Sequence, residues 1–297
     1  MIVSGKLIDT PILCVYICVS FRNLRDTDSG FRESTMGSGK TKPEIQEPES
    51  STNEGYTQPL FDEKSKTYKN PWKTWSEPQF TNVLKFIWGE TDHSNIPETR
   101  VLDKELPVLT PDFARLKSFP KSGVQMMWIG HASVLVQFDG ISVLTDPVFS
   151  QRASPLQIMG PKRYRPPPCK IEELPHVDAV VISHNHYDHL DYGSVKKLNA
   201  KFGDKLWWYV PAGTKQWMVD TGCSNVVELS WWEESKYPND PKISFALWGS
   251  WVVKGPNHSF YFAGDTGYCE GFKQIGRKYG PITSAAIPIG AYEPSKI

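Results

Sequence analysis

The stretch VISHNHYDHLD, residues 181–191, places three histidines and two aspartates directly behind an apolar run. The chain has only seven histidines in 297 residues, so three of them within six positions are a marked concentration. His184 and His186 lie two apart, and in extended backbone their side chains point the same way and can share one cation. Asp188 and His189 follow after a turn and can face a second position. Imidazole and carboxylate ligands suit zinc, which explains the cluster better than solvated loop histidines do.

The segments on both sides of this stretch predict strands that alternate with helices. DAVVIS (178–183) is a short apolar run typical of a buried strand, and Asp191 can cap a helix through SVKKLNAKFG. Upstream, we expect strands in QMMWIG, SVLVQFDG and ISVLTDP, the last two joined as a hairpin by the FDG turn. Downstream, we expect strands in KLWWYVP, NVVELSWW, KISFALWGSWVV, SFYFAGD and SAAIPIG, and helices in TKQWMVDTG and CEGFKQIGRKYG. This alternation indicates a layered α/β or α+β sandwich.

The N-terminal part has a different composition. Residues 22–70 are polar and lack apolar periodicity, so we expect a disordered arm over 1–70 and one domain over 71–297. The apolar run at 10–21 is shorter than the about 20 residues of a spanning helix, which leaves an irregular start or a membrane signal. GSGKT lacks the first glycine of a phosphate-binding loop, since Ser34 stands there. The apolar spacing within 80–88 predicts a helix that packs on the core or rests in a bilayer interface.

Composition narrows the class of partner. The formal net charge is zero, which argues against binding nucleic acid through bulk phosphate attraction. The five cysteines are spread widely and form no CxxC pair, so we expect reduced thiols and an intracellular protein. The paired positions Trp207–Trp208, Trp217–Met218 and Trp231–Trp232 suit either core packing or lipid contact.

The motif HNHYDHLD carries the HxHxDH pattern and resembles the metallo-β-lactamase fold, an αββα sandwich. A narrower resemblance covers about residues 70–294. Together with GPKRYR, WWEE, LWGSWVV, FYFAGDTGY and IPIGAYEP, the motif resembles the N-acyl-phosphatidylethanolamine-hydrolysing phospholipase D family. The resemblance implies that a metal-bound hydroxide attacks the phosphodiester, and that the products are an N-acylethanolamine and phosphatidic acid.

The resemblance also implies a pair of zinc ions. His184 and His186 would hold the first ion, and Asp188 and His189 the second. Asp265, in FAGDTGY, would bridge both ions, and Asp188 and Asp265 would therefore take part in catalysis.

Three further positions follow from the same resemblance. Asp146 would orient a ligand from behind, although it could instead cap the turn before Pro147. Gln157 and Tyr187 would contact the substrate, but Ile158 stands where the family has a tyrosine.

The chain departs from the family pattern at two more histidines. One belongs to a segment that is absent here, because ISFALWGSW runs straight through, and the other lies beyond AYEP, where the chain ends in SKI. We therefore expect a sandwich that is incomplete at the C-terminus and has an exposed sheet edge. The family would bind two zinc ions, and here we expect weakened affinity and room for one ion or fewer. His131 can approach the site, whereas His258 would lie roughly 23 Å from Asp265 along a straight strand. His93 is expected in a surface loop, and His176 at the wrong end of its strand.

Several interpretations stay open at this point. The chain is an active zinc phospholipase with replacement ligands, an impaired form that only binds lipid or membrane, or an incomplete gene product. A lactonase or nuclease of the same superfamily is the alternative chemistry. The resemblance further implies a phospholipid substrate, a membrane surface, bile acids as modulators, a homodimer, and a peripheral location on internal membranes of the Golgi or endosome.

Overall fold

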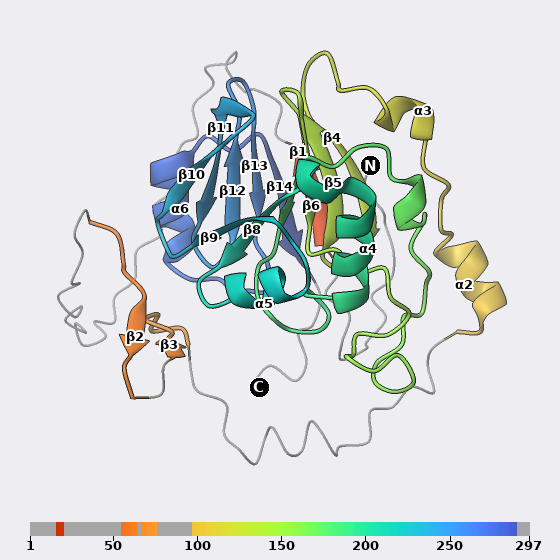
Figure 1. Cartoon of the computed structure of the whole chain (residues 1–297), viewed down its shortest axis with the longest axis horizontal. Coiled ribbons are helices and arrows are strands. Elements are labelled where there is room, and N and C mark those ends of the chain that lie inside the picture. Colours follow the sequence, from red (N-terminus) through yellow and green to blue (C-terminus); the bar gives the residue numbers. More distant parts are fainter. Residues whose placement is uncertain (1–15, 21–54, 65–66, 76–96, 290–297) are drawn as a thin grey trace, which may run out of the picture.

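The computed structural model describes residues 16–20, 55–64, 67–75 and 97–289, and builds them around two six-stranded sheets (Figure 1). The first sheet is antiparallel through its first three strands and parallel from β6 to β9. It runs in the order β4 (Gln125–Gly130), β5 (Ser133–Phe138), β6 (Ile141–Thr145), β7 (Ala179–Val181), β8 (Trp207–Pro211) and β9 (Asn225–Leu229).

The second sheet is antiparallel except where β13 pairs with β14. Its order is β1 (Tyr16–Ser20), β14 (Ser284–Pro288), β13 (Ser259–Phe262), β12 (Trp251–Lys254), β11 (Asp240–Leu247) and β10 (Glu234–Tyr237). A separate hairpin joins β2 (Leu60–Asp62) and β3 (Thr67–Lys69).

The two sheets pack face to face over the main core. In β5, Val134 and Val136 point into this core, whereas Leu135 points to the opposite face and packs in a second cluster. Val143 and Leu144 of β6 divide in the same way. Both faces of the first sheet are therefore buried, which explains why its strands read as continuous apolar runs.

Helices cover the two outer faces and complete the predicted αββα sandwich (Figure 1). α4 (Tyr192–Phe202) and α5 (Lys215–Asp220) lie on the first sheet, and α6 (Gly271–Tyr279) lies on the second. The carboxylate of Asp191 accepts from the backbone N–H groups of Gly193 and Ser194, as the predicted N-cap of α4. Short helices complete the described chain: α2 (Thr99–Glu105), α3 (Phe113–Leu116), η1 (Ile171–Glu173) and η2 (Gly203–Lys205).

The β5–β6 hairpin forms at the predicted FDG turn. Asp139 and Gly140 both adopt positive φ, of 46° and 82°, as a two-residue hairpin turn requires.

Two strand predictions need correction, and one strand was missed. KISFALWGSWVV is two antiparallel strands, β11 and β12, because the chain turns at residues 248–250. The strand predicted through NVVELSWW ends at Leu229, since Trp232 adopts a φ of 67° in the turn that follows. β10 was not predicted, because its sequence ESKY is mostly polar and its strand conformation comes from pairing with β11.

The N-terminal region also differs in part from the expected arm. β1 lies within the apolar run at 10–21 and pairs with β14, so the described chain covers the sheet edge that we expected to find exposed. β2 and β3 also lie within residues 1–70, so part of the arm that we expected to be disordered forms strands. Most of that range, and the helix predicted over 80–88, lie outside the described residues, so the division at residue 70 stays a prediction.

Candidate metal centre

The candidate residues lie where strands of both sheets end. Asp146 directly follows β6, and His184 lies shortly after the adjacent parallel strand β7. Asp265 follows β13 of the second sheet. The indole N–H of Trp251 in β12 donates to the backbone oxygen of Ile182 at 2.8 Å, which ties the two sheets together next to the site. Side chains that are far apart in the sequence therefore meet at one edge of the sandwich.

His189 lies at the centre of the cluster and is fully buried. Its Nδ1 lies 2.7 Å from Oδ2 of Asp146, which is also fully buried. Asp146 in turn accepts from the backbone N–H of Ser183 at 2.7 Å and from its hydroxyl at 2.5 Å. A carboxylate can only accept, so Nδ1 carries the proton and Nε2 is directed into the site. Asp146 therefore lies where the prediction of an orienting carboxylate needs it.

His184 and His186 lie together, as their spacing predicts. Nε2 of His184 is 2.9 Å from Nδ1 of His186, and Nδ1 of His184 is 2.9 Å from the Ser183 hydroxyl. Burial and the neighbouring His189 lower the pKa of His184 to about 4. The ring is therefore neutral at physiological pH, which is the form that binds a metal.

Two carboxylates lie near Nε2 of His189. Nε2 of His189 is 3.2 Å from Oδ2 of Asp265 and 3.8 Å from Oδ2 of Asp188. Burial would raise the pKa of Asp188, but the hydrogen bond with His131 and the nearby His189 lower it to about 2. Burial would lower the pKa of His189, but Asp146 and Asp265 raise it to about 10.

Gly264 lets Asp265 come close to the histidine strand. Its φ is +63°, and an added Cβ would lie 2.9 Å from Cβ of Ser183. A larger residue would push the β13 end away from β7, so the glycine of FAGD is needed for this approach.

His131 also belongs to the cluster. Its Nε2 lies 3.1 Å from Oδ2 of Asp188, and its ring is edge-on to His189 with centroids 5.0 Å apart. The sequence indicated only that His131 could approach the site. Its place depends on a register shift between Trp128 and Gly130, a non-local feature that no motif marks.

Two of the other histidines, His258 and His176, lie away from the cluster, as predicted. His258 bonds Asp139 at the opposite end of the β5–β6 hairpin, with Nδ1 and Oδ1 2.7 Å apart. His176 is half exposed and bonds Asp178. His93 lies outside the described residues.

The two predicted substrate contacts lie on exposed surface. Tyr187 is 58% exposed next to the histidines, where a bound substrate could reach it. Gln157 instead organises its own loop, because its amide accepts from the backbone of Arg152 and donates to the backbone oxygens of Arg152 and Ser154. No described contact joins Gln157 to the histidine cluster, so its role in binding stays a prediction.

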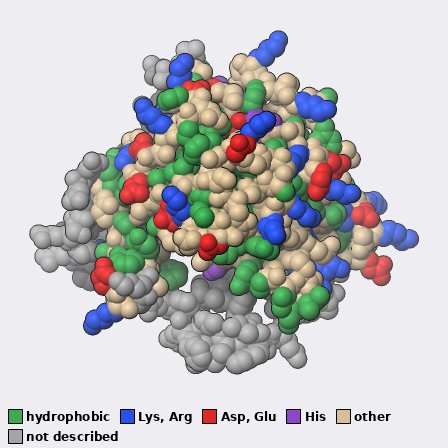
Figure 2. Space-filling view, viewed as in Figure 1, with side chains coloured by type: hydrophobic (Ala, Val, Ile, Leu, Met, Phe, Trp, Pro, Cys, Tyr) green, Lys and Arg blue, Asp and Glu red, His purple; other side chains and the backbone are tan. Residues whose placement is uncertain are grey.

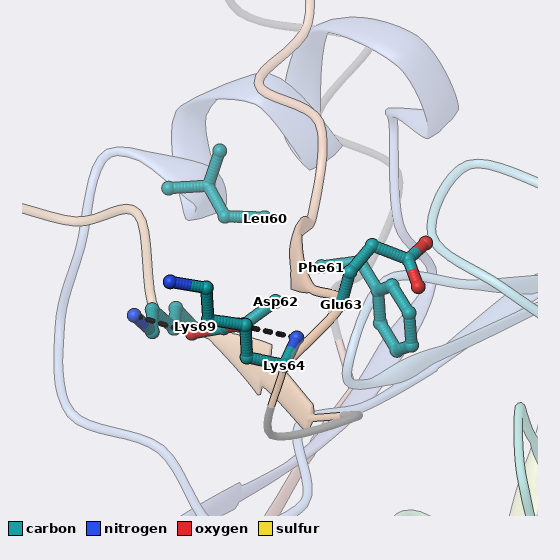
Figure 3. A pocket seen from close by; sticks show the side chains of 6 residues that line it. All are labelled: Leu60, Phe61, Asp62, Glu63, Lys64 and Lys69. Atoms are coloured by element: carbon teal, nitrogen blue, oxygen red, sulfur yellow. Dashed lines mark hydrogen bonds and ion pairs between the residues drawn. The ribbon is translucent and has the colours of Figure 1, made fainter.

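Two hollows lie away from this centre. One, of about 460 Å³, is lined by residues of the β2–β3 hairpin (Figure 3), where Lys69 pairs with Asp62 at 2.7 Å. The other, of about 610 Å³, lies beside Asp139 and His258. Neither contains a predicted site residue.

The tryptophan pairs divide between core and surface. Trp208 is fully buried in the first sheet, and Trp231 and Trp232 pack against Trp248. Trp217 is 37% exposed. Among the described residues, no helix has the length and apolar character to cross a membrane.

The donors in the cluster fit a divalent metal. Two groups have ligand atoms that all lie within 4.8 Å of one another: His131, Asp188 and His189, and His184, His189 and Asp265. The Nε2 of His189 is buried and has no partner in hydrogen-bond geometry among the described residues. Neutral imidazoles beside ionised carboxylates are ligands of the zinc type, and a cation here would replace the proton of His189.

Comparisons with known proteins agree with this geometry. Residues 142–297 match the family model described as "Beta-lactamase superfamily domain". The chain is 42% identical over 260 residues to "N-acyl-phosphatidylethanolamine-hydrolyzing phospholipase D 1" of Caenorhabditis elegans, covering 77% of this chain and 72% of the relative. It is 33% identical over 242 residues to the mitochondrial N-acyl-phosphatidylethanolamine-hydrolyzing phospholipase D of Saccharomyces cerevisiae, covering 71% of this chain and 50% of that one.

Among solved structures, a metallo hydrolase from the archaeon Ignicoccus hospitalis matches with a TM-score of 0.42 and 19% identity, covering 53% of this chain and 67% of that chain. A further relative by sequence, a "metal-dependent hydrolase" of Caldivirga maquilingensis, is 30% identical over 175 residues, covering 56% of this chain and 70% of that one. With the candidate ligands, the likeness to this Caldivirga hydrolase supports a hydrolase with a metal cofactor. The chain belongs to the beta-lactamase superfamily and, within it, to the family of the N-acyl-phosphatidylethanolamine-hydrolysing phospholipases D.

Proposed function

We propose that the chain is a zinc-dependent phosphodiesterase that hydrolyses N-acyl-phosphatidylethanolamine to an N-acylethanolamine and phosphatidic acid. The observation that carries the proposal is the convergence of His184, His189 and Asp265 from two sheets on one group of mutually close ligand atoms. The relatives named for this reaction are the 42% and 33% identical phospholipases of nematode and yeast.

The chain's own residues would prepare the site for zinc. Asp146 holds the proton on Nδ1 of His189, so that Nε2 is presented to the metal. The lowered pKa of His184 keeps its ring neutral, and the lowered pKa of Asp188 keeps its carboxylate ionised. When bound, zinc would activate water and stabilise the charge that develops on the phosphodiester. Tyr187, exposed beside the cluster, would contact the substrate.

The substrate is a membrane lipid, and one exposed loop has the apolar side chains that contact with a lipid surface requires. Leu156, Ile158 and Met159 are 55%, 85% and 60% exposed. Figure 2 shows hydrophobic side chains gathered at the lower right of the molecule, where Figure 1 places the light-green loop after β6. The backbones of Arg152 and Lys162, at the two ends of the loop, pair as an isolated antiparallel β-bridge. The apolar side chains therefore lie between two cationic residues. This arrangement favours peripheral contact with anionic phospholipid.

We extend the proposal to a peripheral location on internal membranes such as those of the Golgi or endosome. A homodimer and modulation by bile acids follow from the family resemblance alone, and no contact in the described part of the chain bears on them.

The test is an assay of the purified 297-residue chain with N-acyl-phosphatidylethanolamine in mixed micelles, with zinc added and with zinc removed by chelation. We expect N-acylethanolamine and phosphatidic acid in equal amounts by mass spectrometry, only with zinc. His189→Ala should abolish both products, whereas His176→Ala, which changes a half-exposed histidine outside the cluster, should leave them unchanged.

Other outcomes would separate the alternatives. Bound zinc without products, together with binding to lipid vesicles, would favour an impaired lipid-binding form. Turnover of a lactone or a nucleic acid in place of the phospholipid would favour a different hydrolase of the superfamily. Aggregation of the purified chain would favour an incomplete gene product.

A further inference from the structure

We propose that His131 is a metal ligand, and that His131, Asp188 and His189 together hold one ion of the centre. This inference rests on the proposed metal-dependent function. The ligand set implied by the sequence resemblance does not contain His131. The structure brings its Nε2 within 3.1 Å of Asp188, and the three residues offer ligand atoms within 4.8 Å of one another.

The backbone around His131 turns its side chain toward the site. The register of β4 and β5 shifts between Trp128 and Gly130, which is the mark of a bulge. His131 itself adopts a φ of 51°, in the left-handed region that only a few per cent of residues other than glycine occupy. The indole N–H of Trp128 donates to the backbone oxygen of His131 at 2.8 Å and holds this conformation. A strained residue that points into a site is typical of functional positions.

The valence of His189 favours His131 as an additional ligand. Nδ1 of His189 is engaged by Asp146, so only the single lone pair of Nε2 is open to a metal. The two candidate groups both contain His189, yet one lone pair can serve only one ion. If His189 serves the ion beside Asp188, then His131 gives that ion a third protein ligand. His184, His186 and Asp265 remain for the other ion. Three protein ligands and one open position are the usual arrangement of catalytic zinc.

The burial of the three residues suits a metal position rather than a solvated contact. The side chain of His131 is 12% exposed, that of Asp188 is 27% exposed, and that of His189 is fully buried. His131 and Asp188 come from loops that are 57 positions apart, so the contact is made by the fold and not by local sequence.

The competing explanation is that His131 only orients Asp188 through a hydrogen bond. A glutamine at position 131 could replace His131 in the orienting role but not as a metal ligand. A glutamine amide can donate a hydrogen bond to Asp188, but it is a poor zinc ligand compared with imidazole. His131→Ala and His131→Gln therefore form an informative pair, and His176→Ala, in a histidine–aspartate pair outside the cluster, is the matched control.

The experiment titrates the metal-free 297-residue chain with zinc against a chromophoric chelator, and counts bound ions by elemental analysis. Cobalt is titrated in parallel, because its visible spectrum reports the number and type of ligands. Circular dichroism and thermal unfolding confirm that each variant folds. We expect both His131 variants to bind the second ion at least about 100-fold more weakly, beyond the ~10–100-fold loss typical of an orienting group. Their cobalt spectra should change, and those of His176→Ala should not.

Two results would overturn the inference while leaving the proposed function intact. One is metal binding by His131→Ala that equals that of His176→Ala. The other is recovery of affinity and spectrum in His131→Gln, which would make His131 a positioning residue. If the unaltered chain binds no metal at all, the proposed function itself fails, and this inference fails with it.

Discussion

At the scale of single residues, two aspartates in the first sheet make nearly the same contact at opposite ends. Asp146 and Asp139 both adopt positive φ, and each lies 2.7 Å from the Nδ1 of a histidine, His189 and His258 respectively. Only the first histidine belongs to the candidate metal centre. Comparing substitutions of Asp146 and Asp139 therefore distinguishes the structural effect of an aspartate–histidine hydrogen bond from its effect on metal binding.

Asp146→Asn should weaken zinc binding by roughly 10–100-fold, because a side-chain amide can donate to Nδ1 and shift the proton of His189 to Nε2. The protonated Nε2 could then no longer bind a metal. Isothermal titration with zinc measures the change in affinity. Asp139→Asn should lower the unfolding temperature about as much as Asp146→Asn does, without changing zinc affinity. Equal losses of zinc affinity in the two variants would contradict the assignment of Asp146 to the metal centre.

The sequence predicted some of these residues from local spacing, one from a family resemblance, and one only as a histidine that could approach the site. His184, His186, Asp188 and His189 stand within one short motif, so their spacing alone places them together. Asp265 lies on the other sheet, and only the resemblance to a known family connected it with the histidines. His131 depends on the bulge between β4 and β5, which is a property of strand pairing that no single segment encodes.

At the scale of elements, α6 depends on one close contact with the second sheet. A Cβ added at Gly271, the first residue of α6, would overlap the indole ring of Trp248. A Cβ at Gly276, on the exposed side of the same helix, would meet nothing within 4 Å. One glycine is therefore required by packing, and the other only lowers helix propensity.

Gly271→Ala should lower the free energy of unfolding by about 1–3 kcal/mol, since Trp248 or the whole helix must shift. Gly276→Ala should raise it by up to about 1 kcal/mol, because alanine favours helix. Urea unfolding followed by tryptophan fluorescence measures both. A Gly271→Ala protein as stable as the parent would show that α6 does not pack on Trp248 as described.

Elements with a strong pattern were predicted more accurately than those defined by their partners. The buried parallel strands β7 and β8 read as apolar runs because helices and the second sheet cover both of their faces. β10 has the sequence ESKY and takes its conformation from pairing with β11. β1 lies in an apolar run, but its place beside β14, far along the chain, could not be inferred from local sequence.

At the scale of the whole molecule, the stability should fall at alkaline pH. Burial raises the pKa of Cys169 and of Cys223 to about 11, compared with an ordinary value of 9.0. Because the folded pKa is the higher one, the stability that these neutral thiols contribute is fully present below pH 9. It is lost as pH rises from 9 through 11, since the unfolded chain ionises first.

At pH 10 the loss should be about 1 kcal/mol for each thiol. Urea unfolding at pH 8 and at pH 10 measures it, and a Cys169→Ala, Cys223→Ala double variant should show a smaller difference between the two values. An unchanged difference would assign the alkaline sensitivity to other groups, such as the buried phenol of Tyr237, whose pKa burial raises to about 12.

The metal centre also joins the two halves of the sandwich. Asp265 comes from the second sheet, while His184 and His189 follow β7 of the first, and their ligand atoms all lie within 4.8 Å of one another. A bound ion would therefore cross-link the sheets and stabilise the folded chain. At a free zinc concentration 100 times the dissociation constant, the gain is about 2.7 kcal/mol.

We therefore expect thermal unfolding at a clearly higher temperature with zinc than with a chelator. Asp265→Ala removes the ligand from the second sheet and should abolish most of this difference. Asp240→Ala, at the start of β11 in the same sheet and outside the cluster, should preserve it. If Asp265→Ala keeps the full rise in unfolding temperature with zinc, the ion is held by the first sheet alone, and the two sheets are joined only by their core and by contacts such as the Trp251–Ile182 hydrogen bond.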